Sequence, residues 1–173
     1  GSPGEDGTVQ GMLDLMQIPY THSGTTTSAI AIDKELTKAV LVPGGVRMPR
    51  GKMVESRALF EADPMARPYV LKPVNEGSSV GVAIVTAEGN YGNPIGRDVE
   101  GPWHHFDQLL AEPFIKGREL TVAVLNGEAL AATELKPKAG FYDYDAKYTD
   151  GLTTHVCPAD VPASIAKAML DMA

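Results

Sequence analysis

A lysine and a glycine–serine loop between two apolar runs are the residues of this sequence best suited to chemistry. The stretch from Tyr69 to Val85 reads YVLKPVNEGSSVGVAIV, with Lys72 ahead of the loop Gly77-Ser78-Ser79. Glycines let the backbone approach an anion, successive N–H groups form a concave nest for it, and an ammonium adds compact positive charge. These residues predict a phosphate site, although the same glycines could serve only the turn of a hairpin.

Two better-known phosphate motifs are absent from the sequence. It contains no GxxxxGK[ST] pattern and no GxGxxG between a strand and a helix. Because the glycine–serine loop leads into a second apolar run, no helix dipole faces the phosphate. Lysine charge and a metal ion would have to neutralise it.

The composition indicates a folded protein with a small substrate. The 173 residues are 43% hydrophobic, which is enough for a core, and the net charge is −7. This negative charge argues against nonspecific binding to nucleic acid or to an anionic membrane. No apolar run approaches membrane-spanning length and Cys157 is the only cysteine, so we expect a cytoplasmic protein.

Hydrophobic spacing predicts the elements that carry these residues. Apolar runs predict strands at residues 69–71, 80–85, 109–115, 119–125, 128–135 and 153–158. Helical spacing predicts helices at residues 8–18, 25–41, 56–62, 104–111 and 162–173. Asn126-Gly127 predicts a tight hairpin turn, and 42–68, rich in proline and glycine, is expected to be mostly irregular and to hold the domain seam.

Several further residues have both a chemical and a structural interpretation. Lys34 and Lys38 are typical of a solvated helix face, and Glu112, before Pro113 at an expected strand edge, could hold an amine. The tyrosine-rich stretch 139–151 is expected to be a loop without helix or strand, either a lid or a surface loop whose tyrosines pack on the scaffold.

Metal-binding and nucleophilic chemistry find little support in the sequence. The four histidines have no metal-ligand spacing, and no Ser/His/Asp triad can be assigned. Cys157 is expected to be a small buried hydrophobe, and Trp103 is expected to pack rather than bind.

Three stretches in combination, PGEDGTVQG, YVLKPVNEGSSVGVAIV and GFYDYDAKY, resemble the bacterial D-alanine–D-alanine ligases, which are ATP-grasp enzymes. The resemblance covers the whole chain and implies an α+β ATP-grasp fold. It implies that residues 1–26 end the N-terminal substrate domain, that 27–112 form the central lobe, and that 113–173 begin the C-terminal lobe. The seam expected at 42–68 would then lie inside the central lobe.

The resemblance also implies the site residues. It assigns ATP contacts to Lys38, Lys72, Ser78, Ser79, Glu112, Phe114, Ile115, Glu119 and Lys147. Among these, the lysines would contact phosphates, Glu112 the adenine amino edge and Glu119 the ribose. It assigns catalytic roles to Ser78, Lys147 and Tyr148, and substrate binding to Glu5, Ser78, Tyr142 and Tyr148.

The implied reaction joins two D-alanines for peptidoglycan synthesis. ATP would activate one D-alanine carboxylate as an acyl phosphate, with Mg²⁺ or Mn²⁺, and the amine of the second would attack it. Tyr148 favours D-alanine as the second substrate. A D-alanyl-D-lactate-type ligase, another ATP-grasp carboxylate–amine ligase and a non-catalytic nucleotide-binding module remain alternatives, and the resemblance implies a homodimer.

The sequence departs from the family's pattern at both ends. The family's first-domain acid and Gly-rich opening would precede Gly1, and its arginine and Mg²⁺ ligands would lie beyond Ala173. The chain begins without methionine and ends inside an expected helix. We therefore expect a fragment of a longer protein, without ligase turnover of its own.

Overall fold

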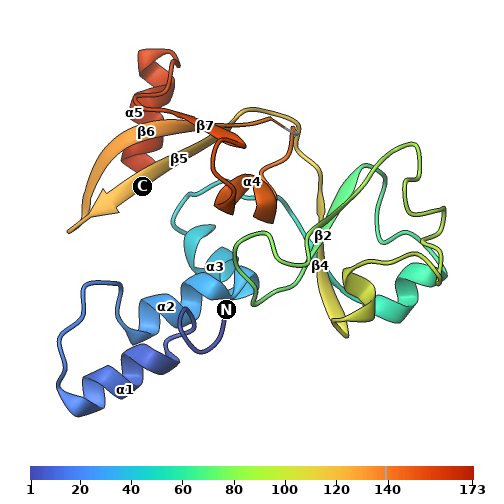
Figure 1. Ribbon diagram of the computed structural model, residues 1–173, viewed down its shortest axis with the longest axis horizontal. Helices are drawn as coiled ribbons and strands as arrows, with labels where there is room; N and C mark the ends of the chain where they lie inside the picture. The colour runs from blue at the N-terminus through green and yellow to red at the C-terminus, as the bar shows by residue number, and fades with distance from the viewer. Residues whose placement is uncertain (139) are drawn as a thin grey trace. The chain divides into compact units, whose positions relative to one another are not determined.

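The computed structural model describes residues 1–138 and 140–173 (Figure 1). The chain divides into two compact units, residues 1–114 and 115–173. The stretch 42–68 lies within the first unit, so the seam predicted there is wrong. Ala139, the first residue of the predicted tyrosine-rich loop, lies outside the described residues.

A four-stranded antiparallel sheet lies at the centre of the first unit, in the order β1-β4-β2-β3. Its strands are β1 (Lys52–Glu55), β2 (Tyr69–Lys72), β3 (Ala83–Val85) and β4 (Gln108–Pro113). The strand–loop–strand prediction is confirmed, but β3 begins at Ala83 rather than at residue 80. The turn extends to Gly81, whose φ of 67° is in the left-handed region.

β4 is an inner strand, so the prediction of a strand edge at 109–115 is wrong. It pairs with β1 on one side and β2 on the other. The predicted helix at 104–111 is also wrong, since a 3-10 helix, η2 (Pro102–His104), ends at His104 and β4 begins at Gln108. Leu109, Leu110 and Ala111 are fully buried. Because successive side chains point to opposite faces of the sheet, both faces are covered along this run.

The core of the first unit lies against one face of this sheet. In β2 the alternation of buried and half-buried residues turns Tyr69 and Leu71 inward. The core residues are Leu59, Tyr69, Leu71, Ala83, Val85, Ile95, Trp103, Leu109 and Ala111. Trp103 is buried, as predicted. A second 3-10 helix, η1 (Ser56–Phe60), contributes Leu59 and confirms the short helix predicted near 56–62.

Three α-helices belong to the first unit: α1 (Thr8–Met16), α2 (Thr25–Ile32) and α3 (Lys34–Leu41). The prediction of one helix over 25–41 is wrong, because Asp33 interrupts it. Asp33 has extended backbone, and its carboxylate accepts hydrogen bonds from the N–H groups of Glu35 and Leu36, each at 2.9 Å. It therefore ends α2 and caps α3.

The second unit is a three-stranded antiparallel sheet with a helix on one side (Figure 1). Its elements are β5 (Glu119–Leu125), β6 (Glu128–Pro137), α4 (Tyr144–Tyr148), β7 (Thr153–Val156) and α5 (Ala163–Met172). The hairpin prediction is confirmed, with positive φ at Asn126 and Gly127. α5 contacts β6.

Two predictions for the second unit are wrong. The tyrosine-rich stretch contains a helical turn, α4, because the Asp143 carboxylate caps it by accepting a hydrogen bond from the N–H of Ala146 at 2.8 Å. Cys157 is exposed rather than buried. Among the described residues, no helix is long and apolar enough to cross a membrane.

Candidate functional site

In the first unit, two lysines from different elements meet one buried carboxylate. Glu112, on β4, is 4% exposed. One of its oxygens forms an ion pair with Lys38 of α3 and the other with Lys72 of β2. Val70 is paired with Glu112 and Lys72 with Leu110, so Lys72 and Glu112 are diagonal neighbours on the sheet. We call Lys38, Lys72 and Glu112 the lysine–glutamate cluster.

The charges of this cluster stabilise one another. Burial by itself raises the pKa of Glu112, but the hydrogen bonds and charges of Lys38 and Lys72 outweigh it and hold that pKa below its ordinary value. The carboxylate is therefore charged at neutral pH. It keeps two ammonium groups close together in a partly buried place. A polyphosphate requires such a concentration of positive charge.

Gly51 has no side chain, and the lysine–glutamate cluster occupies the space where one would lie. A Cβ on Gly51 would lie 2.8 Å from Cγ of Glu112 and 2.9 Å from Nζ of Lys38. A side chain would have to displace the ion pair. Sequence reasoning missed Gly51, because a glycine in a stretch rich in glycine and proline carries no further signal.

The glycine–serine loop between β2 and β3 has an unusual backbone. Ser78 and Ser79 have φ values of 52° and 60°, in the left-handed region that few non-glycine residues adopt. The N–H of Val80 donates to the carbonyl of Gly77 at 3.0 Å. Strained backbone of this kind is characteristic of functional loops.

Glu5 borders this loop. A Cβ on Gly77 would lie 3.2 Å from Oε2 of Glu5, so the carboxylate faces the loop's backbone. The structure therefore places Glu5 beside the loop that contains Ser78 and Ser79. Oε2 of Glu5 also accepts from the N-terminal ammonium of Gly1. The substrate-binding role that the resemblance implies for Glu5 stays a prediction.

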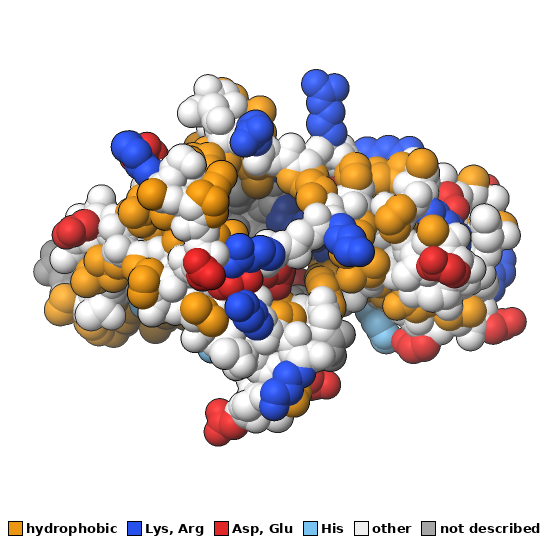
Figure 2. All heavy atoms as spheres, turned by 90° about the horizontal axis from the view of Figure 1, so that it is seen from above, with side chains coloured by type: hydrophobic (Ala, Val, Ile, Leu, Met, Phe, Trp, Pro, Cys, Tyr) orange, Lys and Arg blue, Asp and Glu red, His pale blue; other side chains and the backbone are white. Residues whose placement is uncertain are grey.

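The described residues fit a phosphate group better than a metal ion. Two lysines and a loop of small residues are the usual components of a phosphate site. Within residues 1–138 and 140–173, no group of three or more His, Cys, Asp or Glu side chains could hold a metal. On the face seen in Figure 2, Lys and Arg side chains lie next to Asp and Glu side chains, so that face carries charge of both signs.

The second unit contains the other residues expected at the site. Nζ of Lys147, on α4, lies 5.2 Å from the ring centroid of Tyr142, a cation–π contact. The rings of Tyr144 and Tyr148 are 4.8 Å apart. Burial raises the pKa of Glu119, at the start of β5, above its ordinary value, and the charge of Lys147 offsets only part of this rise. Lys147 is therefore close enough to Glu119 to influence its charge.

Phe114 and Ile115 lie on the two sides of the division between the units. The N–H of Phe114 donates to the carbonyl of Pro68 at 3.1 Å, which ties the end of β4 to the start of β2. Ile115 is 69% exposed. Their role in lining an adenine base stays a prediction.

Sequence reasoning also missed a role for Lys34. Its ammonium does not lie on a solvated face but donates to the carbonyls of Val74 and Glu76, at 3.1 and 2.7 Å. Helical spacing alone could not distinguish the two interpretations, because the acceptors come from a segment distant in the sequence.

Known proteins similar to this chain agree on one family. The family model described as "D-ala D-ala ligase C-terminus" matches residues 49–173. A protein of Sphingopyxis alaskensis named D-alanine–D-alanine ligase is 73% identical over 173 residues, which are all of this chain and 56% of that protein. The chain spans about half of the length of the curated relatives it matches.

Solved structures give the same answer. The D-alanine–D-alanine ligase of Bacillus anthracis has a TM-score of 0.68 at 30% identity, over 99% of this chain and 57% of that one. The VanG D-Ala:D-Ser ligase of Enterococcus faecalis has a TM-score of 0.70 at 27% identity, over 99% of this chain and 51% of that one. The expected α+β ATP-grasp fold is confirmed. This chain therefore belongs to the D-alanine–D-alanine ligase family, to whose C-terminal part its residues 49–173 correspond.

Proposed function

We propose that this chain supplies most of the ATP site of an ATP-dependent D-alanine–D-alanine ligase that makes peptidoglycan precursors. The observation that carries the proposal is the lysine–glutamate cluster, which gathers two ammonium groups in the unit that also contains the Ser78–Ser79 loop. Membership of the D-alanine–D-alanine ligase family supports ATP as the ligand of this phosphate site.

Each residue of the cluster has a role in this proposal. Lys38 and Lys72 bind phosphate oxygens of ATP, and Glu112 accepts from the adenine amino group after exchanging its lysine partners. Ser78 and Ser79 close over the phosphates, and Glu5 holds the amine of the first D-alanine. Because these groups bind and neutralise charge rather than form a covalent bond, their contribution to the rate is positioning and electrostatic stabilisation.

Residues from 113 onward, most of them in the second unit, have their own roles in the proposal. Glu119 binds the ribose, backbone near Phe114 and Ile115 lines the base, and Lys147 contacts phosphate. Tyr142 and Tyr148 close over the substrates and exclude water from the activated carboxylate. We further propose that residues 1–26 end the N-terminal substrate domain, that 27–112 form the central lobe and that 113–173 begin the C-terminal lobe.

In the proposed reaction, the carboxylate of one D-alanine accepts the γ-phosphoryl group of ATP, and the amine of a second D-alanine then displaces phosphate to form the peptide bond. Mg²⁺ or Mn²⁺ would neutralise the phosphates, with ligands from outside this chain. A cytoplasmic homodimer is the setting that we propose for this activity.

A ligase that uses a different second substrate is the other candidate. One of the similar solved structures is named a D-Ala:D-Ser ligase, so the fold occurs with more than one acceptor. Tyr148 favours D-alanine in our proposal. Product analysis with D-alanine, D-serine and D-lactate in competition separates the two, since D-alanyl-D-alanine as the main product supports the first candidate.

The main test measures release of phosphate from ATP with D-alanine and Mg²⁺ by the full-length protein. We expect Lys72→Ala to abolish release and Lys52→Ala to leave it unchanged, because Lys52 is an exposed residue of β1. The same assay on residues 1–173 alone is expected to give no release. If the full-length protein binds ATP but releases no phosphate, it is a non-catalytic nucleotide-binding module, and the proposal is wrong.

A further inference from the structure

Glu134, on β6, is a buried carboxylate that the proposed reaction does not use. It is 4% exposed, and its two oxygens accept hydrogen bonds from Nε and Nη2 of Arg118, at 2.6 and 2.7 Å. Nη2 of Arg118 also donates to the backbone carbonyl of Asp160, at 2.8 Å. Paired hydrogen bonds between a guanidinium and a carboxylate fix the orientation of both groups as well as their separation. The guanidinium therefore has a defined place on the sheet of the second unit.

Arg118 connects the two outer strands of this sheet. It directly precedes β5, whereas Asp160 lies in the segment that follows β7, and β6 is the strand between them. The N–H of Ala159 donates to the carbonyl of Ala132 in β6 at 2.8 Å, so the segment after β7 continues along that strand. One side chain thus crosses β6 and ties the start of β5 to the other side of the sheet.

The residue that follows Arg118 is Glu119, the first residue of β5. In the register of β5 and β6, Glu119 is paired with Leu135, and Leu120 is paired with Glu134. Because successive side chains of a strand point to opposite faces, Glu119 and Glu134 project from opposite faces of the sheet. A ligand of Glu119 therefore does not touch the Arg118–Glu134 pair. The pair can influence such a ligand through the backbone that carries Glu119.

The chain just before β5 has little packing of its own. Residues 115–119 are exposed, and a Cβ on Gly117 would meet no heavy atom within 4 Å. An exposed segment that contains a glycine has more backbone freedom than a packed one. The hydrogen bonds of Arg118 are charge-assisted, so they supply a restraint that packing does not.

We propose that Arg118 is a positioning residue that, held by Glu134, fixes the start of β5 and with it the place of Glu119, the carboxylate that meets the ribose hydroxyls of ATP. Selectivity for a ribose that keeps its hydroxyl groups then depends on a side chain that does not touch the nucleotide. The effect on the nucleotide rests on the proposed function, whereas the restraint on β5 does not.

The first measurement is a double-mutant cycle on the full-length protein, with phosphate release as the assay. It compares ATP with dideoxy-ATP, which lacks both ribose hydroxyl groups, as the ratio of their kcat/KM values. A general loss of folded enzyme affects both nucleotides equally and cancels in this ratio. We expect the unsubstituted protein to prefer ATP by at least about tenfold, because a hydrogen bond to a charged group is at stake.

The two substitutions are expected to act on the same contact. Glu119→Ala should abolish the preference for ATP, and Arg118→Gln should remove most of it. In the Glu119→Ala background, Arg118→Gln should change the ratio by less than about twofold, because no carboxylate remains to be positioned. Lys136, 3.3 Å from Glu134, still partners the carboxylate in Arg118→Gln, so we expect this variant to fold.

Two further variants serve as controls. Lys116→Gln removes an exposed cation two positions before Arg118 and should leave the preference for ATP unchanged. Arg118→Lys keeps the charge, but one ammonium cannot reproduce the paired geometry of a guanidinium, so we expect an intermediate preference. If Arg118→Gln does not fold, Arg118→Lys takes its place in the cycle under the same criterion.

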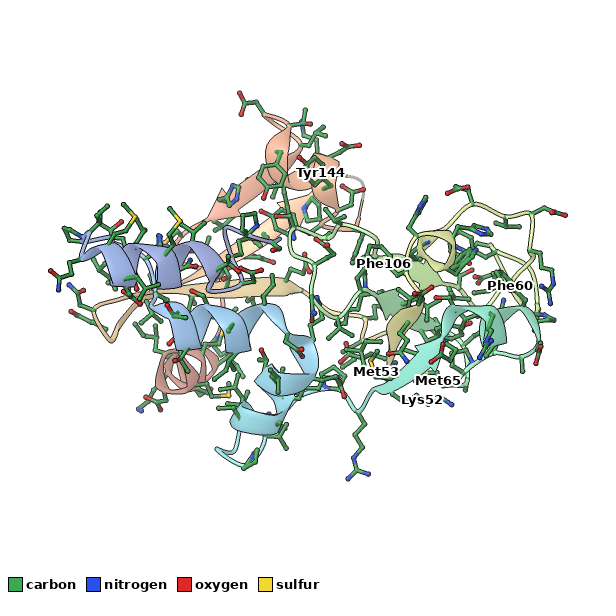
Figure 3. The ribbon with its side chains drawn as sticks, turned by 90° about the horizontal axis from the view of Figure 1, so that it is seen from below. Lys52, Met53, Phe60, Met65, Phe106 and Tyr144 are labelled. Carbon is green, nitrogen blue, oxygen red and sulfur yellow. The ribbon has the colours of Figure 1, made fainter. Side chains whose placement is uncertain are left out.

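The second measurement is amide hydrogen exchange, which does not depend on ATP. In Arg118→Gln we expect residues 118–122 and 159–161 to exchange about tenfold faster, as for the loss of a charge-assisted hydrogen bond. Exchange in β1 of the first unit, whose Lys52 and Met53 are labelled in Figure 3, should stay unchanged.

An unchanged preference for ATP in Arg118→Gln, while Glu119→Ala loses it, would overturn the proposal. An equal effect of Arg118→Gln with and without Glu119 would also overturn it, since Arg118 would then act by another route. If Glu119→Ala keeps the preference, the ribose role in the proposed function is wrong, and faster exchange in Arg118→Gln would support the restraint on β5 alone. Unchanged exchange would remove that restraint as well.

Discussion

Lys38 of α3 and Glu112 of β4 form an ion pair in the first unit, although they are far apart in the sequence. The same carboxylate pairs with Lys72, so one buried negative charge holds two positive ones. An anion that binds both lysines competes with Glu112 for them. The carboxylate therefore keeps the lysines together while allowing them to exchange partners.

Replacing Glu112 with glutamine is expected to destabilise the first unit. The neutral amide cannot balance two ammonium groups, and removing one partner of a buried pair costs about 3 kcal/mol. Urea denaturation should show this loss in the free energy of unfolding. Glu88→Gln, at an exposed position, should change it by less than about 0.5 kcal/mol.

Lys38→Met provides the internal comparison. It leaves Glu112 paired with Lys72, so we expect a smaller loss than in Glu112→Gln. A loss in Lys38→Met equal to or greater than that in Glu112→Gln would mean that the carboxylate does not unite the two lysines.

The parts of the fold that were predictable have local signals. Asn126-Gly127 requires positive φ whatever surrounds it, and the apolar runs beside the glycine–serine loop are bounded by turn residues. The inner position of β4 has no such signal, because the continuous apolar run 109–111 suits a buried helix and a buried strand equally. The capping role of Asp33 was likewise not predictable, since it depends on where the chain leaves one helix and begins the next.

Most of the candidate site residues were named through the family resemblance, and their ligand roles stay predictions. Lys72 and the loop suggested phosphate by themselves, but the meeting of Lys38 with Glu112 depends on the packing of α3 against the sheet. Glu112 and Lys72 become neighbours through the register of β2 and β4, which single residues do not encode. Lys34 and Gly51 were missed for the same reason.

Gly81→Ala is expected to distort the glycine–serine loop. Gly81 has a φ of 67°, and a Cβ there would lie 2.8 Å from Cγ of Pro73 and 2.9 Å from Cε2 of Phe106. We expect a loss of about 2–3 kcal/mol in the free energy of unfolding and weaker ATP binding, measured by urea denaturation and by titration with a fluorescent ATP analogue.

Gly45→Ala is the matched control for backbone strain. Gly45 has a φ of 95° but no heavy atom within 4 Å of its Cβ position. It should lose only the cost of the left-handed conformation, about 1 kcal/mol, and keep its affinity for ATP. Equal effects of the two substitutions would show that contact with Pro73 and Phe106 is unimportant.

Gly101→Ala is expected to displace Trp103 from the core. A Cβ on Gly101 would overlap ring atoms of Trp103, which is 4% exposed and donates from Nε1 to the carbonyl of Val99 at 3.0 Å. We expect a loss of about 3 kcal/mol in the free energy of unfolding. Trp103 is the only tryptophan of the chain, so a red shift of its fluorescence would report the displacement directly.

Gly117→Ala is the control for Gly101→Ala. Gly117 has no heavy atom within 4 Å of its Cβ position, and its φ is not in the left-handed region. Its stability and fluorescence should match those of the unsubstituted protein. An unshifted fluorescence spectrum in Gly101→Ala would show that the ring adapts in place.

The second unit is expected to lose stability in acid through Glu134. Arg118 donates from Nε and Nη2 to the two Glu134 oxygens at 2.6 and 2.7 Å, and this pairing lowers the pKa of Glu134 to about 2. Because the folded-state pKa lies below the ordinary value of 4.5, the stabilisation is complete above about pH 4.5 and is lost as the pH falls through about 2.

NMR titration of the Glu134 carboxyl carbon measures this pKa, and urea denaturation between pH 2 and 6 measures the stability. In Arg118→Gln the pKa should rise towards 4.5 and the pH dependence should weaken, with Lys136, 3.3 Å from Glu134, retaining part of both. A pKa near 4.5 in the unsubstituted protein would mean that the Arg118–Glu134 pair does not stabilise the unit.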